Sequence, residues 1–242
     1  KASPLINNAV INLGNVRVGA ASPTQAVSIS NVATVAPQAA LNATVSAAAP
    51  ITASGSFNLL APGATNNSDI VVGMQTGTAG AKNGNATVSF VSDASNVGNC
   101  APNCQLGIGT QNVSVSGNVF NAAVGSATPT PVTLANQRVG GTGSQLLTVS
   151  NTAAAGAFSE ALNASFGANT GAATNNGGSV GNLIAGGNNA ALMSVGVNTT
   201  TAGNQAGTVT LNYQTDGTGP NGNSGLAAIG AAHDTEQQAA LV

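Results

Sequence analysis

The only two cysteines of the chain, Cys100 and Cys104, lie in the stretch Cys-Ala-Pro-Asn-Cys. Cysteines this close can bind a metal, exchange thiols or close a local disulfide. A zinc site needs four ligands, and His233 is the single histidine. A thioredoxin-type motif has two intervening residues and a βαβ setting, and this pair has three residues between its members. We therefore predict a loop disulfide between Cys100 and Cys104, which fits an oxidising compartment, and no metal or cofactor site.

The chain contains serine, histidine and aspartate, the residue types of a hydrolase triad. His233 stands beside Asp234 in a stretch with little pattern, and no Gly-x-Ser-x-Gly turn lies between a strand and a helix. Asp93 and Asp216 each follow a strand pattern, and the internal repeat described below makes their positions equivalent. Asp216 is followed by Gly217, and Asp-Gly is a strong turn signal. We expect both to form turns or accept backbone hydrogen bonds. The sequence thus predicts no catalytic residue and no enzymatic activity.

Charge is scarce along the whole chain. Charged residues make up 4% of it, against about 25% in an ordinary soluble domain, and the formal net charge is −2. Four Lys and Arg cannot follow a phosphate backbone, which excludes nucleic-acid binding. The repeated Arg17 and Arg138 are expected to cap loop carbonyls or cover apolar surface, or else to hold an acid or a ligand across a sheet edge. No apolar run approaches 18 residues, so no membrane span is predicted.

Alternation of apolar and polar residues predicts strands. Runs rich in Val, Ile and Thr with this period occur at 26–30, 86–90, 112–116, 147–150 and 208–213. Clusters of Gly, Asn, Pro and Asp separate them, as turns require. The stretch 227–241 is a candidate helix because Glu236, Gln237 and Gln238 favour one. Otherwise the short, evenly spaced strands indicate an all-β chain of β-sandwiches.

An internal repeat is the most informative feature of the sequence. Ile11–Gly19 matches Val132–Gly140, and further matches keep the same order as far as Asp93 and Asp216. We predict a first sandwich at 10–121, a proline-containing linker at 122–131 and a second sandwich at 132–242. The second copy ends without alternation, so it either lacks its own final strand or closes differently. Residues 1–10 precede the repeat and form a spare strand segment, a candidate donor strand.

The repeated patterns resemble the bacterial choice-of-anchor D domain family. The resemblance rests on L-x-N-x-R-V-G blocks, a V-S-N strand end, a closing V-x-V-x-G-x-V strand and the following segments: Leu13–Gly19, Leu134–Gly140, Val149–Asn151, Val113–Val119, Tyr213–Gly219 and Ser224–Leu226. It implies two tandem immunoglobulin-like domains in a secreted or surface-anchored bacterial protein, without enzymatic activity. Since the chain begins at Lys1 and not at Met, a processed chain is expected.

These features together predict an extracellular structural protein. Sheet edges are usually guarded by charges, and this chain has few to spare. We expect a head-to-tail homopolymer, a pilus-like filament at the bacterial surface, in which residues 1–10 of one subunit add a strand to the next. The inserted apolar positions are Leu5, Ile6, Val10 and Ile11. The alternative is a monomeric surface stalk or adhesin that binds polysaccharide of a biofilm matrix.

Overall fold

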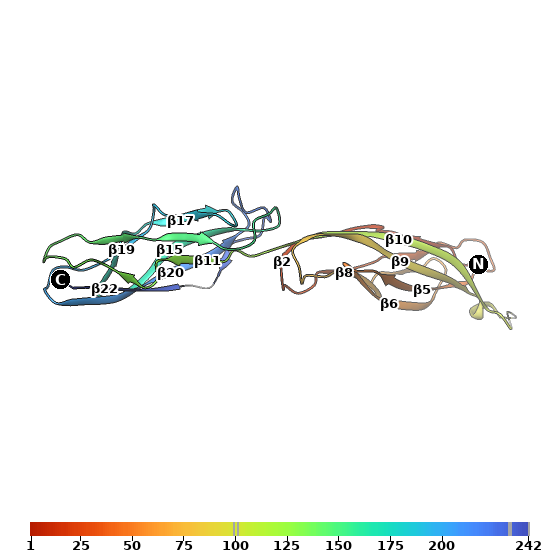
Figure 1. Cartoon of the computed structure of the whole chain (residues 1–242). Coiled ribbons are helices and arrows are strands. Elements are labelled where there is room, and N and C mark those ends of the chain that lie inside the picture. Colours follow the sequence, from red (N-terminus) through yellow and green to blue (C-terminus); the bar gives the residue numbers. More distant parts are fainter. Residues whose placement is uncertain (99, 101, 232–233, 242) are drawn as a thin grey trace. The chain divides into compact units, whose positions relative to one another are not determined.

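The chain is built from β-strands, as the alternation predicted (Figure 1). This computed structural model describes most of the chain, namely residues 1–98, 100, 102–231 and 234–241, of which 96 and 234–241 are described without their side chains. The one helical element in these ranges is a 3-10 turn, η1 (Ser95–Val97), and no helix there could cross a membrane. The chain divides into two compact units, Lys1–Val119 and Phe120–Val242.

Unit 1 is formed by ten strands. They are β1 (Pro4–Ile6), β2 (Val10–Arg17), β3 (Thr24–Ala26), β4 (Ile29–Asn31), β5 (Ala40–Ala47), β6 (Ile51–Leu60), β7 (Thr65–Asn66), β8 (Ile70–Met74), β9 (Gly80–Asp93) and β10 (Gln105–Phe120), whose last residue belongs to unit 2. Their order is β2-β10-β9-β5-β6-β8-β3 in the larger sheet and β1-β4-β7 in the smaller. β6 pairs with β8 as far as Gly55 and with β5 from Ser56 onward. Gly55 has φ +103° and stands so close to the Asp69 carbonyl that no Cβ would fit.

Twelve strands make up the described part of unit 2. They are β11 (Gly125–Thr128), β12 (Val132–Thr133), β13 (Ser144–Leu146), β14 (Thr148–Asn151), β15 (Ala161–Gly171), β16 (Ala173–Asn175), β17 (Ser179–Leu183), β18 (Asn188–Asn189), β19 (Ser194–Val197), β20 (Asn204–Asp216), β21 (Ile229–Gly230) and β22 (Asp234–Leu241). They form sheets in the orders β12-β22-β20-β15-β17, with β21 on β20, β11-β14-β18 and β13-β19-β16.

Each unit has its own apolar core, made chiefly from the inward residues of the alternating strands. In unit 1 the alternate residues Ala86, Val88 and Phe90 of β9 all point inward and are 2% exposed or less. In unit 2 Val209 and Leu211 of β20 do the same. Because most core residues are Val, Leu, Ile and Ala, many small contacts supply the burial that a few aromatic anchors supply elsewhere.

The repeated Arg-Val-Gly motif forms the same turn in both units. Gly19 and Gly140 have φ of +79° and +77°, a region that suits glycine, and their N–H groups donate to the carbonyls of Thr76 and Thr199, each over 3.0 Å. The carbonyl oxygen of each arginine accepts the N–H of the third residue after it. The motif therefore repeats because of its backbone, to which each arginine contributes its carbonyl oxygen.

Part of the stretch predicted as a linker, 122–131, is a strand. β11 lies within that stretch and pairs with β14, with Gly125 opposite Asn151, just as β1 pairs with β4, with Pro4 opposite Asn31. The segment before each repeat is thus an edge strand of the unit that follows it. Residues 1–10 consequently have a counterpart in unit 2 and are no spare segment.

Of the two predicted endings of unit 2, a missing final strand or a different closure, the structure has the unit closed by a strand of its own. The stretch expected to be a helix or a missing strand contains β21 and β22. β22 pairs antiparallel with β20 from Asn204 opposite Leu241 to Leu211 opposite Asp234, and parallel with β12. Pairing with the backbone of β20 overrides the helical preference of its Glu and Gln residues, because propensity is a weak term beside a sheet ladder.

Candidate functional site

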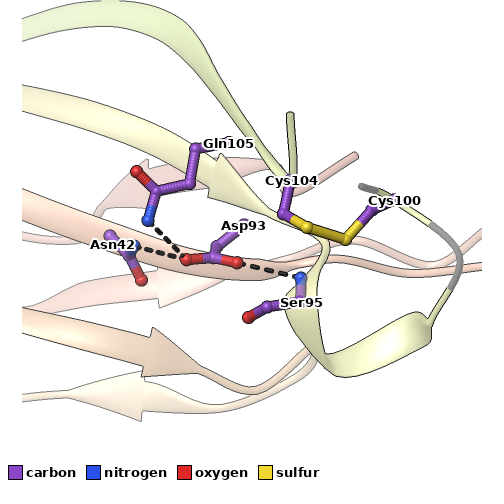
Figure 2. Close-up of a disulfide and its surroundings, with 6 residues drawn as sticks. All are labelled: Asn42, Asp93, Ser95, Cys100, Cys104 and Gln105. Atoms are coloured by element: carbon purple, nitrogen blue, oxygen red, sulfur yellow. Dashed lines mark hydrogen bonds between the residues drawn. A yellow bond between two sulfur atoms is a disulfide. The ribbon is translucent and has the colours of Figure 1, made fainter. Parts of the chain in front are cut away.

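The two cysteines lie in the loop that joins β9 to β10. They form a disulfide with a Cα–Cα distance of 4.8 Å, so neither sulfur is a thiol or a metal ligand (Figure 2). At the base of the loop the Ala94 N–H donates to the Cys104 carbonyl over 2.8 Å. The bridge closes a short ring at the tip of a long hairpin and connects no distant parts of the fold.

Asp93 ends β9 directly beside this loop and accepts hydrogen bonds from three neighbours (Figure 2). The Ser95 N–H donates to Oδ1 over 2.9 Å, and Gln105 and Asn42 donate to Oδ2 over 2.9 and 3.0 Å. The Ser95 hydroxyl and N–H, followed by Gln105 and Asn42, hold the pKa of Asp93 well below its usual range. The prediction that Asp93 forms a turn is confirmed. A carboxylate held ionised by this many donors is poorly suited to take up a proton in catalysis.

The same Asn–Asp pair recurs in unit 2, where Asn163 donates to Asp216 over 3.0 Å. In both units the Asn side-chain oxygen also accepts the N–H of a residue with positive φ on the neighbouring strand. That residue is Leu59, with φ +56°, in unit 1 and Asn182, with φ +57°, in unit 2. The pair therefore fixes a local irregularity between two strands in each sandwich.

A buried asparagine ties the smaller sheet of each unit to the rest. Asn31 is wholly buried and donates to the carbonyls of Ala39 and Leu60, while its oxygen accepts the N–H groups of Ser3 and Ala33. The internal repeat aligns Asn31 with Asn151, the last residue of the V-S-N pattern in unit 2, and this shared asparagine is the signal that the sequence offers for the role.

Unit 2 contains a buried acid that the sequence analysis missed. Glu160 is fully buried, and Thr215 donates its hydroxyl to Oε2 over 2.6 Å while Ser224 donates to Oε1. Thr215 in turn accepts the Ala123 N–H over 2.8 Å. The group links the segment before β11, β20 and the loop after β20. Its place corresponds to Ala39 of unit 1, and a charged residue replacing an alanine in the repeat was the available signal.

The four predicted assembly residues lie in unit 1 as part of its own fold. Ile6 and Ile11 are 8% and 1% exposed and belong to the core, whereas Leu5 and Val10 are 47% and 78% exposed. β1 pairs through Leu5 with Ser30 and through Ile6 with Ile29 of β4. In the single chain the segment predicted as a donor strand, residues 1–10, pairs within its own unit, and its exchange between copies stays a prediction.

One face of unit 2 carries an open, polar hollow of about 650 Å³ between β15, β17, β20 and β21. Amide and hydroxyl side chains line much of it, including Asn163, Ser165, Asn212 and Gln214. Tyr213 contributes to the lining but is 2% exposed, so its ring offers little stacking surface.

The remaining candidates do not assemble into a reactive centre in the part of the chain that is described. His233 lies outside the described residues, as does the side chain of Asp234. Within the described residues no three His, Cys, Asp or Glu side chains gather where a metal ion could bind. The polar clusters that do exist connect strands and loops of their own units.

No protein-family model matches the sequence, and no curated protein sequence matches it. Among solved structures the chain is similar to a PapD-like domain of human CEP192, at 13% identity and TM-score 0.32, covering 49% of this chain and 86% of that one. It is similar to the YadV chaperone at 12% and 0.32, covering 96% and 98%, and to an I-band fragment of titin at 9% and 0.35, covering 100% and 65%. These neighbours are β-sandwich domains of immunoglobulin-like or PapD-like type, and at such scores no function is transferred from them.

Proposed function

We propose that the chain is a non-enzymatic structural module of the bacterial cell surface, in which two β-sandwich units in series act as a stalk. The observation that carries this proposal is the use of the acidic side chains. Each of the four described carboxylates, Asp69, Asp93, Glu160 and Asp216, accepts hydrogen bonds that hold a loop or strand of its own unit. Chemistry by proton transfer needs a positioned acid or base in a cleft, and these groups serve the fold instead.

The placement outside the cell rests on the disulfide. A bridge between Cys100 and Cys104 persists in an oxidising compartment and is rare in the cytosol. A surface with few charges, made largely of Asn, Thr, Ser and Gly, is also little affected by changes of salt and pH. The proposal includes membership of the choice-of-anchor D family, on the repeated blocks at Leu13–Gly19 and Leu134–Gly140.

A stalk should resist extension, and pulling on the full chain from its two ends tests this. We expect two separate unfolding events, each lengthening the chain by about 40 nm, since each unit is a compact body of similar length. Antibody labelling of intact cells should detect the chain at the surface. Unfolding without a resisting force, or labelling only after the cells are opened, would contradict the proposal.

Self-assembly into a fibre is a second candidate, favoured by exposed apolar residues on edge strands. Val10 on β2 is 78% exposed, and Leu146 on β13 is 49% exposed. Edges of this kind invite strand addition from another copy. Electron microscopy of the purified chain should then show fibres that the Val10→Lys and Leu146→Lys variants do not form, whereas dispersed particles at every concentration would exclude this candidate.

Polysaccharide is the partner that a monomeric adhesin would take, and the polar hollow of unit 2 is where we would seek it. Its amide and hydroxyl groups suit sugar hydroxyls, although a stacking ring is missing from the described lining. Retention of the chain on immobilised dextran or alginate, reduced in an Asn212→Ala variant, would support this role. If the parent chain and the variant pass through the matrix equally fast, the polysaccharide-binding role is excluded.

A further inference from the structure

The last residue of β10 packs within unit 2, ahead of β11, the first strand that lies wholly in this unit. Phe120, the last residue of β10, is 4% exposed, and its ring centre lies 5.4 Å from that of Phe158. The next residue, Asn121, donates its N–H to the Phe158 carbonyl over 2.8 Å and accepts the Glu160 N–H over 3.0 Å. Asn121 and Ser159 thereby form a parallel bridge.

The same position can be located in unit 1 through the buried asparagines. Asn151 donates to the Glu160 carbonyl over 3.1 Å, and Asn31 donates to the Ala39 carbonyl over 3.1 Å. Ala39 therefore corresponds to Glu160. Counting back along the chain, Pro37 takes the place of Phe158.

In unit 1 this position is uncovered. Pro37 is exposed, whereas Phe158 is half-buried. Val32 and Val35 on the same loop are 43% and 80% exposed. A hollow of about 600 Å³ lies between this loop, 32–37, and residues 1–3. The loop thus presents an apolar surface where unit 2 has an aromatic side chain seated.

A backbone donor is also left without a partner there. Ala39 is 5% exposed, and among the described residues none accepts a hydrogen bond from its N–H. Buried N–H groups without an acceptor are rare, because each costs free energy comparable to a lost hydrogen bond. The corresponding N–H in unit 2, that of Glu160, has its acceptor in Asn121.

We propose that the surface formed by residues 1–3 and 32–39 is a docking site for the end of the last strand of a further β-sandwich unit. The incoming residue accepts from the Ala39 N–H and donates to the Pro37 carbonyl, and the side chain before it is aromatic and covers Pro37 and Val35. The contact resembles β-strand addition, but only the last residue of the incoming strand forms backbone hydrogen bonds. Such contacts would connect successive β-sandwich units along one chain. The docking contact depends neither on a location outside the cell nor on fibre formation.

The occupant is a strand held by its own sandwich and not a loose peptide. Two backbone hydrogen bonds contribute too little to offset the cost of ordering a flexible peptide. In unit 2 the docked residues continue β10, whose preceding residues pair with β9, so that the strand end arrives already ordered. The chemistry required is therefore an aromatic residue followed by one with a backbone N–H, at the end of a paired strand.

The test adds such a strand end to the full chain. A second copy of residues 1–121 is placed directly before Lys1, so that its β10, paired with its own β9, ends in Phe120 and Asn121 at the site. The matched control carries Phe120→Ala and Asn121→Pro in the added copy, which removes the ring and the last N–H. Only the original 242 residues are isotopically labelled, so that the Ala39 observed is theirs. Amide exchange of Ala39, followed by NMR, should slow about tenfold with the unaltered added copy relative to the control. Exchange of the Glu160 amide serves as the internal reference and should not change. Equal exchange of Ala39 in the two proteins would overturn the proposal.

Two further measurements separate the occupants. If the free pentapeptide Gly-Asn-Val-Phe-Asn, the sequence of residues 117–121, protects the Ala39 amide of the unextended chain as well as the attached unit does, the site binds peptides and the commitment to a paired strand end is wrong. If protection rises with the concentration of the unextended chain alone, a second copy fills the site, and the proposed occupant is again wrong. Protection by the attached strand end alone is the result that we expect.

Discussion

Asn31 and Asn151 make the same four side-chain hydrogen bonds in their two units. Each donates to two carbonyls and accepts two N–H groups, which uses the whole hydrogen-bonding capacity of an amide. One N–H group comes from the residue just before β1 or β11, and the other comes from the loop after the asparagine. One carbonyl belongs to the segment just before β5 or β15, and the other belongs to the last residue of β6 or β17. One residue thus joins four parts of each sandwich.

Replacing Asn31 by alanine should lower the stability of unit 1 by roughly 3 kcal/mol, because buried backbone groups lose their partners. The effect should be confined to the altered unit. Native-state exchange of the Val88 amide reports on unit 1 and that of Val209 on unit 2. Asn151→Ala should reverse the pattern, and Asn58→Ala, on an exposed residue of unit 1, should leave both amides unchanged. Equal loss at Val88 and Val209 would mean that the two units do not unfold separately.

Acid should weaken unit 1 through Asp93. Donors from Ser95, Gln105 and Asn42 lower its pKa in the folded chain, whereas an unfolded aspartate titrates near about 4. The stabilisation is therefore complete above that pH and is lost as the pH falls toward the folded pKa. The urea midpoint of unit 1 should be lower at pH 3 than at pH 7, and Asp93→Asn should narrow this difference. Part of the difference should persist, because hydrogen bonds from Asn66 and Ser68 also lower the pKa of Asp69. A difference as large as in the parent chain would show that Asp93 is not the group responsible.

The strands that alternate could be predicted from the sequence, and those that do not alternate could not. β9, β10 and β20 bury every second residue over much of their length, so their pattern is visible without a structure. β22 has the sequence Asp-Thr-Glu-Gln-Gln-Ala-Ala-Leu, and its strand conformation comes from pairing with β20. Pairing partners distant in sequence are not visible in a local pattern.

The polar connections could be located from the sequence only in part. The internal repeat makes Asp93 and Asp216 equivalent positions, and both were predicted to form turns or accept backbone hydrogen bonds. The bonds of Asn31 reach from Ser3 to Leu60, and no spacing rule connects such distant backbone groups. Pro4-Leu5-Ile6 and Gly125-Ser126-Ala127 share no residue, so the sequence does not reveal that each pairs with the strand that ends in the buried asparagine of its unit.

The disulfide should stabilise unit 1 only modestly. A ring this short constrains little of the unfolded chain, so loss of the bridge in a Cys100→Ser, Cys104→Ser double variant should cost about 2 kcal/mol or less. Unit 2 carries no cysteine and should be unaffected. Guanidinium unfolding of the parent chain with and without a reductant provides the matching control. Collapse of both units on reduction would contradict the local role assigned to the bridge.

Leu59 is the one described leucine with a left-handed backbone, and asparagine occupies the equivalent position 182 in unit 2. A branched side chain at positive φ costs about 1–2 kcal/mol, and asparagine tolerates that region better. Leu59 is 52% exposed, so its removal sacrifices little buried area. Leu59→Asn should therefore raise the stability of unit 1 by up to about 1 kcal/mol, measured as slower exchange of the Val88 amide. Leu106→Asn, on an apolar residue exposed to 58%, controls for the loss of surface leucine and should give no such gain. A loss of stability in the Leu59 variant would show that its side chain contributes more than its backbone costs.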